Sequence, residues 1–179
     1  MTLTNSQVDN VYGGKTEKGA ANGSKVIGKG DTTTIGGSVY GGQGTTGASS
    51  NTVDLNNVKV SGTVGGGKTT SGDASDNKVT LSNKTTFTGD LYAGYTENGN
   101  ATGNEVSLSD VSAPKDVYAS FTKKGQAGGI DDDTRSKVTI TESSVTGSVY
   151  GGYTASGTAN NSSVTIINST ISDSTADEY

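Results

Sequence analysis

A repeat of roughly 26–27 residues constrains this chain more than any other feature of its sequence. A block of the type Val-Tyr-Gly-Gly recurs along the chain, at steps of 28, 25, 27, 26 and 32 residues. Its copies begin near Val11, Val39, Val64, Leu91, Val117 and Val149. A unit this short cannot enclose a hydrophobic core of its own, so its copies must stack on one another. The repeat therefore predicts a solenoid.

Each repeat contains three short segments with the apolar alternation of β-strands. The segment after Val-Tyr-Gly-Gly has the form Val-x-Leu or Val-x-Ile, at Val53/Leu55, Val79/Leu81, Val106/Leu108, Val138/Ile140 and Val164/Ile166, with a divergent first copy at Val26-Ile27. The third segment is shorter and places one apolar residue at Val8, Ile35, Val60, Phe87, Val111, Val145 and Ile171. No stretch has the apolar period of a helix. We predict an all-β, single-stranded β-solenoid of about six coils with three strands each, forming one domain over residues 1–179.

The composition fits stacked coils better than a conventional core. Val, Leu, Ile and Phe total 30 of 179 residues, whereas Gly and Thr number 28 each. In a solenoid the backbone of each coil pairs with its neighbours about 4.8 Å away, so small residues can fill a narrow interior. One column of equivalent positions contains Asn51, Asn77 and Asn104, and stacked asparagines can hydrogen-bond along such a column.

Several function classes are excluded or disfavoured by what the chain lacks. It has no His and no Cys, which removes Ser-His-Asp and Cys-His catalysis, thiolate or imidazole metal sites, and disulfides. Its 13 Lys and Arg against 18 Asp and Glu, without a basic cluster, argue against nucleic acid as a partner. No apolar run approaches the roughly 20 residues that cross a bilayer, so this segment is not expected to insert into a membrane. We expect no cofactor, and the composition favours an extracellular bacterial surface.

The connections between strands carry further expectations. A Gly-x-Ala step recurs, and its glycine is expected to adopt a positive φ while its alanine is buried; the glycines are Gly72, Gly99, Gly125 and Gly157. The fifth repeat contains an insertion at 128–135, where Asp131, Asp132 and Asp133 are candidate Ca²⁺ ligands. Their spacing is not that of an EF-hand or of the nonapeptide calcium repeat, so we expect a solvated loop and assign no metal site.

Two columns of side chains are candidates for a binding surface. If the valine of Val-Tyr-Gly-Gly points inward, its tyrosine points outward at Tyr12, Tyr40, Tyr92, Tyr118 and Tyr150, with a gap at Gly65. Three residues later the column reads Lys15, Gln43, Lys68, Tyr95, Phe121 and Tyr153, which predicts a corner or an exposed site. The binding residues predicted on the C-terminal half are Tyr92, Tyr95, Tyr118, Phe121, Tyr150 and Tyr153. Exposed contiguous aromatic residues often mark contact surfaces. The alternative is a ladder that only rigidifies one face.

An enzymatic alternative rests on two carboxylates. Asp90 and Asp116 each precede the first residue of the block, and neighbouring coils would hold them about 5 Å apart, as in a retaining glycosidase. Two exposed acids, or one weak cation site, would look the same in sequence. We assign no catalytic residue and expect no enzyme. An ice-binding array is disfavoured because its column would mix Asp54 and Ser107 with threonines.

Two copies, GSVYGGYTASGTANNSSVTIINSTI and GDLYAGYTENGNATGNEVSLSDV, resemble the VYGG-type repeats in passenger regions of large bacterial autotransporter adhesins. The resemblance extends from Val8 to about Ile171. It implies a right-handed β-helix, secretion, and a role in adhesion, self-association or biofilm formation. The chain would then be a passenger segment of a parent protein anchored in the outer membrane. Its partners would be itself, through lateral or end-to-end contacts, or surface glycans. The polar tail 173–179 is expected to blunt the C-terminal edge.

Overall fold

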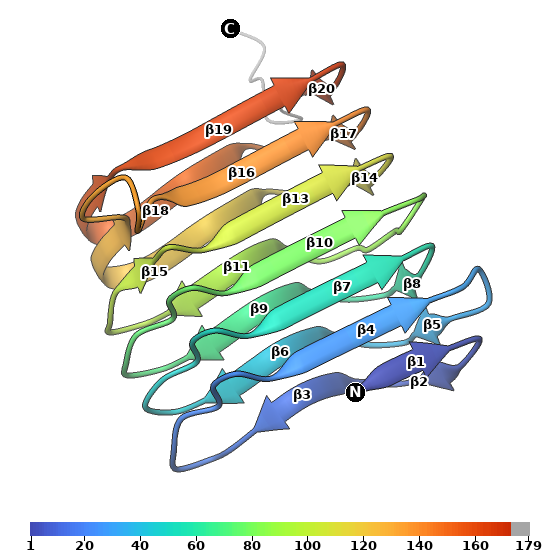
Figure 1. Ribbon diagram of the computed structural model, residues 1–179, viewed down its shortest axis with the longest axis horizontal. Helices are drawn as coiled ribbons and strands as arrows, with labels where there is room; N and C mark the ends of the chain where they lie inside the picture. The colour runs from blue at the N-terminus through green and yellow to red at the C-terminus, as the bar shows by residue number, and fades with distance from the viewer. Residues whose placement is uncertain (173–179) are drawn as a thin grey trace, which may run out of the picture.

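The computed structural model describes residues 1–172, and all regular elements in this part of the chain are β-strands. The strands form three sides that run the length of the molecule: one seven-stranded sheet on each of two sides, and two three-stranded sheets on the third (Figure 1). The first sheet, formed by the Val-x-Leu segments, contains β1 (Thr2–Thr4), β4 (Lys25–Lys29), β7 (Thr52–Asn56), β10 (Lys78–Ser82), β13 (Glu105–Ser109), β16 (Ser136–Thr141) and β19 (Ser162–Ile167). The predicted β-solenoid is confirmed. The tail 173–179 lies outside the described residues.

In the second sheet, six strands each begin at a copy of the Val-Tyr-Gly-Gly block. It contains β3 (Val11–Lys15), β6 (Val39–Gly44), β9 (Val64–Thr69), β11 (Leu91–Thr96), β15 (Val117–Gly128) and β18 (Val149–Asn160), with β12 (Ala101–Thr102) paired to β15. The third side is made of two-residue strands: β2 (Gln7–Val8), β5 (Thr34–Ile35), β8 (Lys59–Val60), β14 (Ser112–Ala113), β17 (Ser144–Val145) and β20 (Thr170–Ile171). Isolated bridges at Thr86 connect β8 to β14 across the fourth coil.

The coil is right-handed. In Figure 1 the chain runs from left to right along the front sheet, returns behind it along the second sheet, and rises from the N-terminus towards the C-terminus. All strand pairs join successive coils in parallel. Right-handed connection between parallel strands is the arrangement that the twist of β-strands favours.

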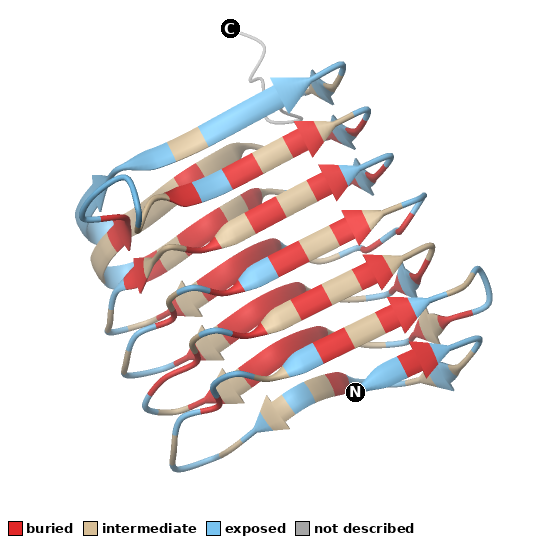
Figure 2. Cartoon of the chain, viewed as in Figure 1, coloured by how far each residue is buried: buried red, intermediate tan, exposed pale blue. Residues whose placement is uncertain are grey.

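The core consists of single-file columns of aliphatic side chains. Val53, Val79 and Val106 stack in register and are fully buried, as are Leu55 and Leu81 beside them. Along the front strands from β4 to β16, buried residues alternate with intermediate or exposed ones, as Figure 2 shows. Because each coil covers the next, few apolar residues are needed per repeat. This accounts for a stable interior in a chain of low hydrophobic content.

The predicted asparagine ladder is present. The Nδ2 of Asn51 donates to Oδ1 of Asn77 at 3.0 Å, and the Nδ2 of Asn77 donates to Oδ1 of Asn104 at 3.0 Å. The same Oδ1 atoms accept the backbone N–H of the preceding asparagine in the column, both at 2.9 Å. All three side chains are buried. The ladder continues into Ser136, whose hydroxyl accepts the N–H of Asn104 at 3.2 Å.

Two expectations about local structure were wrong. Among the four glycines of the Gly-x-Ala steps, Gly125 alone has a positive φ. The others are required by close approach instead, because a Cβ on Gly72 or Gly99 would overlap the backbone of the preceding coil. In the third segment of its coil, Ala113 and not Val111 aligns with Val145, through the pairing of Ser112 with Ser144. Ala113 is therefore the buried residue of strand β14 in this coil.

The last described coil has an open face. Val164, Ile166 and Ile167 are 42%, 47% and 45% exposed, whereas the equivalent Val138 and Ile140 one coil earlier are buried. Figure 2 shows this change as the blue strand β19 beyond the red-banded strands. The Ala159 of the last Gly-x-Ala step is exposed for the same reason, whereas Ala74, Ala101 and Ala127 are buried as predicted.

Candidate functional site

A bend in each strand of the second sheet sends two aromatic columns to the same outer surface. In β11 the register with β15 pairs Tyr92 and Tyr95 with their counterparts but skips Ala93. Ala93 belongs to the core, and a Cβ on Gly94 would collide with the buried Asn104 side chain, so both residues face inward. Two successive inward residues break the alternation. Tyr92 and Tyr95 therefore both face outward, three positions apart.

Six rings form one continuous cluster, which we call the aromatic face: Tyr92, Tyr95, Tyr118, Phe121, Tyr150 and Tyr153. Along the solenoid axis Tyr95, Phe121 and Tyr153 stack with centroids 5.0 and 5.1 Å apart. Tyr118 and Tyr150 stack at 4.9 Å, and Tyr118 meets Phe121 edge-on at 5.2 Å. The structure thus brings together all six residues that the sequence selected. Their role in binding stays a prediction.

The tyrosines next to the gap at Gly65 are more buried than the sequence predicted. Tyr40 and Tyr92 are only 8% and 6% exposed, and their ring centroids lie 6.3 Å apart although a whole coil separates them. A Cβ on Gly65 would lie 2.6 Å from the ring of Tyr92 and 2.8 Å from that of Tyr40. Both rings lean into the space that the missing side chain leaves. The other five rings of the aromatic face are partly exposed.

In the N-terminal half of the same surface, the outer column carries lysines in place of aromatic rings, beside the stacked rings of Tyr12 and Tyr40. The Nζ of Lys15 lies 4.8 Å from the ring centroid of Tyr12. The Nζ of Lys68 lies 5.5 Å from the ring centroids of both Tyr40 and Tyr95. We call Lys15, Gln43 and Lys68 the lysine half of the surface. Ammonium groups over aromatic rings are attracted by the negative ring face, so the two halves have complementary chemistry.

The Asp116 carboxylate is engaged in hydrogen bonds that hold the coils together. Its Oδ2 accepts the hydroxyl of Tyr118 at 2.8 Å, and its Oδ1 accepts the backbone N–H of Ser148 at 2.8 Å. Asn10 occupies the same column, and its Oδ1 accepts the N–H of Ser38 at 2.9 Å. In both cases, a side-chain oxygen of the residue just before the Val-Tyr-Gly-Gly block accepts a backbone N–H of the next coil. Asp90, in the coil before Asp116, is exposed.

Two phenol groups of the aromatic face, those of Tyr92 and Tyr118, have raised pKa values. Burial raises the pKa of Tyr92 well above its usual value, with the neighbouring Tyr40 adding to the effect. Burial also raises the pKa of Tyr118, and the hydrogen bond to Asp116 raises it further because the bond needs the phenol proton. Ionisation of either tyrosine would place a phenolate in a poorly hydrated stack.

We expect the free energy of unfolding to fall as the pH rises above about 10, the ordinary pKa of tyrosine. Both folded-state pKa values are raised, so their contribution to stability is complete below pH ~10 and is lost as the pH rises through the folded pKa. Urea unfolding at about pH 8 and about pH 11.5 measures the loss. The Tyr92→Phe variant should lose less over the same interval. Equal losses in the two proteins would contradict this assignment.

Two aspartates of the insertion, Asp131 and Asp132, interact with other residues of the same loop. The backbone N–H of Thr134 donates to Oδ1 of Asp131 at 2.9 Å, which lowers the pKa of that carboxyl. Arg135 forms an ion pair with Asp132. Within residues 1–172 no group of three or more Asp, Glu, His or Cys is arranged to hold a metal ion. The three aspartates are exposed, and the expectation of a solvated loop rather than a calcium site stays a prediction.

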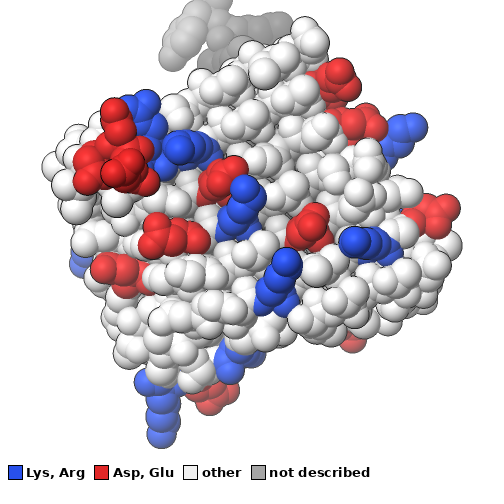
Figure 3. All heavy atoms as spheres, in the orientation of Figure 1, with Lys and Arg blue, Asp and Glu red and all other residues white. Residues whose placement is uncertain are grey.

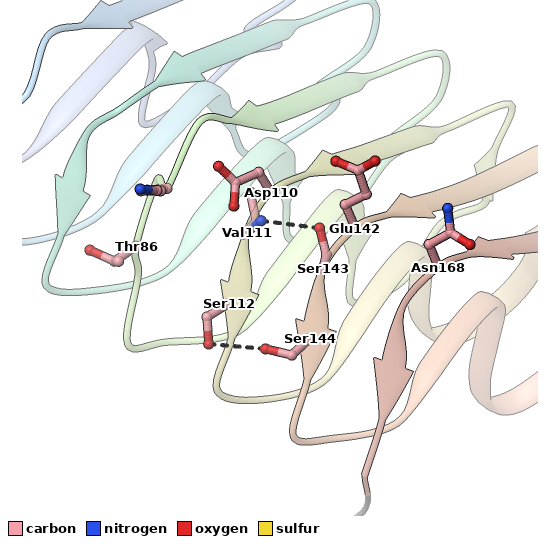
Figure 4. Close-up of a pocket in the computed structure, with 9 residues that line it drawn as sticks. Thr86, Asp110, Val111, Ser112, Glu142, Ser143, Ser144 and Asn168 are labelled. Carbon is pink, nitrogen blue, oxygen red and sulfur yellow. Dashed lines mark hydrogen bonds between the residues drawn. The ribbon is translucent and has the colours of Figure 1, made fainter.

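A second surface feature, not singled out in the sequence, is an open hollow where the first sheet turns into the third side (Figure 4). It has a volume of about 450 Å³, and Asp110, Glu142 and Asn168 lie in a row along it. All three have a positive φ, at 56°, 50° and 49°. Ser143 and Ser144 also line it, and the hydroxyl of Ser143 accepts the N–H of Val111 at 3.1 Å. The row marks the tight turn of each coil, which a column rich in Asn and Asp signals in the sequence.

The front face differs in character from the aromatic face. Figure 3 shows acidic and basic side chains interspersed across most of it, with a group of acidic side chains beside basic ones at its upper left. One pair, Lys78 and Glu105, forms an exposed salt bridge of 3.0 Å between β10 and β13. Exposed pairs of this kind contribute little to stability. The front face therefore offers no concentrated binding chemistry.

Comparisons with known proteins give no relatives: no family model, no curated protein and no solved structure matches this chain. Across residues 1–172 there is also no helix with the length and apolar character needed to cross a membrane.

Proposed function

We propose that this chain is a structural and adhesive segment of a bacterial cell-surface β-helix, and that the aromatic face is its contact surface. The observation that carries the proposal is the contact of six aromatic rings across three neighbouring coils, with five of the rings partly exposed. Tyrosine combines apolar area with a hydroxyl group, which suits it to wet contact surfaces. The resemblance of the repeats to those of autotransporter adhesins supports the cell-surface location.

The scaffold suits adhesion because it holds the rings in fixed positions. Strands β11, β15 and β18 pair in register through backbone hydrogen bonds along the whole aromatic face. Binding to such a surface loses little conformational entropy, since the rings already pack against one another. A longer solenoid would repeat weak contacts along its length, and linked weak contacts give strong overall attachment.

The alternative is a polysaccharide-binding or polysaccharide-cleaving β-helix. Binding of a glycan would use the same aromatic face and is therefore an outcome of the same experiment. Cleavage would use Asp90 and Asp116, but both oxygens of Asp116 accept structural hydrogen bonds. A carboxylate engaged in this way has little freedom to act as a nucleophile or acid, so we favour adhesion.

The test attaches the purified chain to fluorescent beads and measures clumping of the beads, their retention on bacterial cells, and their retention on purified surface polysaccharides. The variant Tyr95→Ser/Phe121→Ser/Tyr153→Ser removes the outer aromatic column. The control variant Thr80→Ser/Thr139→Ser/Thr165→Ser makes three changes to serine on the front face. We expect the aromatic variant to lose at least about tenfold in attachment and the control to match the native chain. Equal attachment of the native chain and the aromatic variant would refute the proposal.

A further inference from the structure

We propose that the partner of the aromatic face is a second copy of this chain, docked antiparallel about a two-fold axis, so that the lysine half of each copy covers the aromatic face of the other. The inference rests on the proposed function and specifies the partner. A two-fold contact uses the same surface on both copies, so that surface must be complementary to itself when reversed. The order of residues along the outer column meets this condition.

The outer column changes character at its midpoint. Strand pairing places its residues in one continuous row along the axis, in the order Lys15, Gln43, Lys68, Tyr95, Phe121 and Tyr153. Three polar residues are followed by three aromatic residues, one per coil. Reversing one copy about the midpoint places Lys15 opposite Tyr153 and Lys68 opposite Tyr95. The two-fold axis repeats both pairs, which gives four ammonium–ring contacts.

Parallel docking of the two copies would bring like charges together. In-register parallel docking would place Lys15 against Lys15 and Lys68 against Lys68, and like charges repel in a partly dehydrated contact. The antiparallel arrangement instead repeats a contact already made within the chain, where the Nζ of Lys68 lies 5.5 Å from the ring of Tyr95. Lys15 is exposed and Lys68 is half-buried, so both ammonium groups can be approached from outside.

The size of the surface predicts a weak, reversible dimer. Six coils at about 4.8 Å give a face roughly 25 Å tall, and it is only two side-chain columns wide. Such a contact lies at the low end of the area range of specific interfaces. We therefore expect a dissociation constant of the order of micromolar, which suits an adhesive contact made many times between neighbouring molecules.

The test mixes two variants that each lack one half of the contact. The first, Lys15→Ser/Lys68→Ser, keeps the aromatic face. The second, Tyr95→Ser/Phe121→Ser/Tyr153→Ser, keeps the lysine half. Sedimentation velocity over about a hundredfold concentration range measures each variant alone and the equimolar mixture, with far-UV circular dichroism to show that both are folded.

The antiparallel arrangement predicts a native dimer, at least about tenfold weaker association of each variant alone, and partial recovery in the mixture, because one copy supplies rings and the other supplies lysines. Undiminished association of the lysine variant alone would indicate parallel stacking of rings and would overturn the inference. Association that survives in both variants would indicate end-to-end contact through the exposed Val164 and Ile166, and would also overturn it. A monomeric native chain that still attaches to polysaccharide would overturn the dimer while leaving the proposed adhesive function intact.

Discussion

Replacing Asn77 by alanine is expected to lower the free energy of unfolding by about 3–5 kcal/mol, because buried polar groups then lose their hydrogen-bond partners. The Oδ1 of Asn77 accepts both the N–H and the Nδ2 of Asn51, at 2.9 and 3.0 Å. Its Nδ2 donates to the backbone oxygen of Ala48 at 2.9 Å and to Asn104 at 3.0 Å. No water can replace these bonds without access to the interior of the coil.

Urea unfolding followed by circular dichroism measures this loss. Asn77→Ser should cost less than Asn77→Ala, because Ser136 already fills the same column and accepts the N–H of Asn104. Asn98→Ala is the matched control: Asn98 is exposed and makes one bond, to the backbone oxygen of Thr70, so its loss should be under about 1 kcal/mol. A cost for Asn77→Ala no greater than that of the control would show that the ladder does not stabilise the fold.

Gly99→Ala is expected to destabilise the chain by about 2–4 kcal/mol, a cost typical of severe overpacking. A Cβ at this position would overlap the backbone oxygen of Gly72 and lie 2.5 Å from its carbonyl carbon. Both atoms belong to the main chain of the neighbouring coil, so no side chain can move aside. Relief requires that two coils separate, which would also stretch the hydrogen bonds beside the contact.

The matched control for this substitution is Gly19→Ala. The nearest atom to a Cβ on Gly19 is the Oγ1 of Thr16, at an ordinary contact distance of 3.5 Å, and Gly19 does not have a positive φ. Its replacement should change the free energy of unfolding by less than about 0.5 kcal/mol, or raise it slightly by restricting the unfolded chain. Thermal unfolding of both variants compares them directly. Similar melting temperatures would mean that the coils adjust more easily than the backbone contact suggests.

Much of the architecture follows from the sequence because the repeat is one-dimensional. Once the spacing of the Val-Tyr-Gly-Gly and Val-x-Leu blocks is known, stacking places each column of residues, and hydrogen bonding between the stacked asparagines could be predicted. The premise that the first residue of the block points inward holds for Val39 and Val64, which are both fully buried. The six residues of the aromatic face also follow from counting along the repeat.

The tertiary structure decided what periodicity does not encode. The bend at Ala93 and Gly94 turns two columns towards one surface, and the register that skips Ala93 is a property of paired backbones. The burial of Tyr92 depends on the absence of a side chain one coil away, at Gly65. The requirement for Gly99 comes from a neighbouring main chain and not from its own φ. The sequence by itself determined which residues share a column, because the chain's period determines stacking. Only the folded coil determined how closely the columns approach one another, because that depends on contacts between coils.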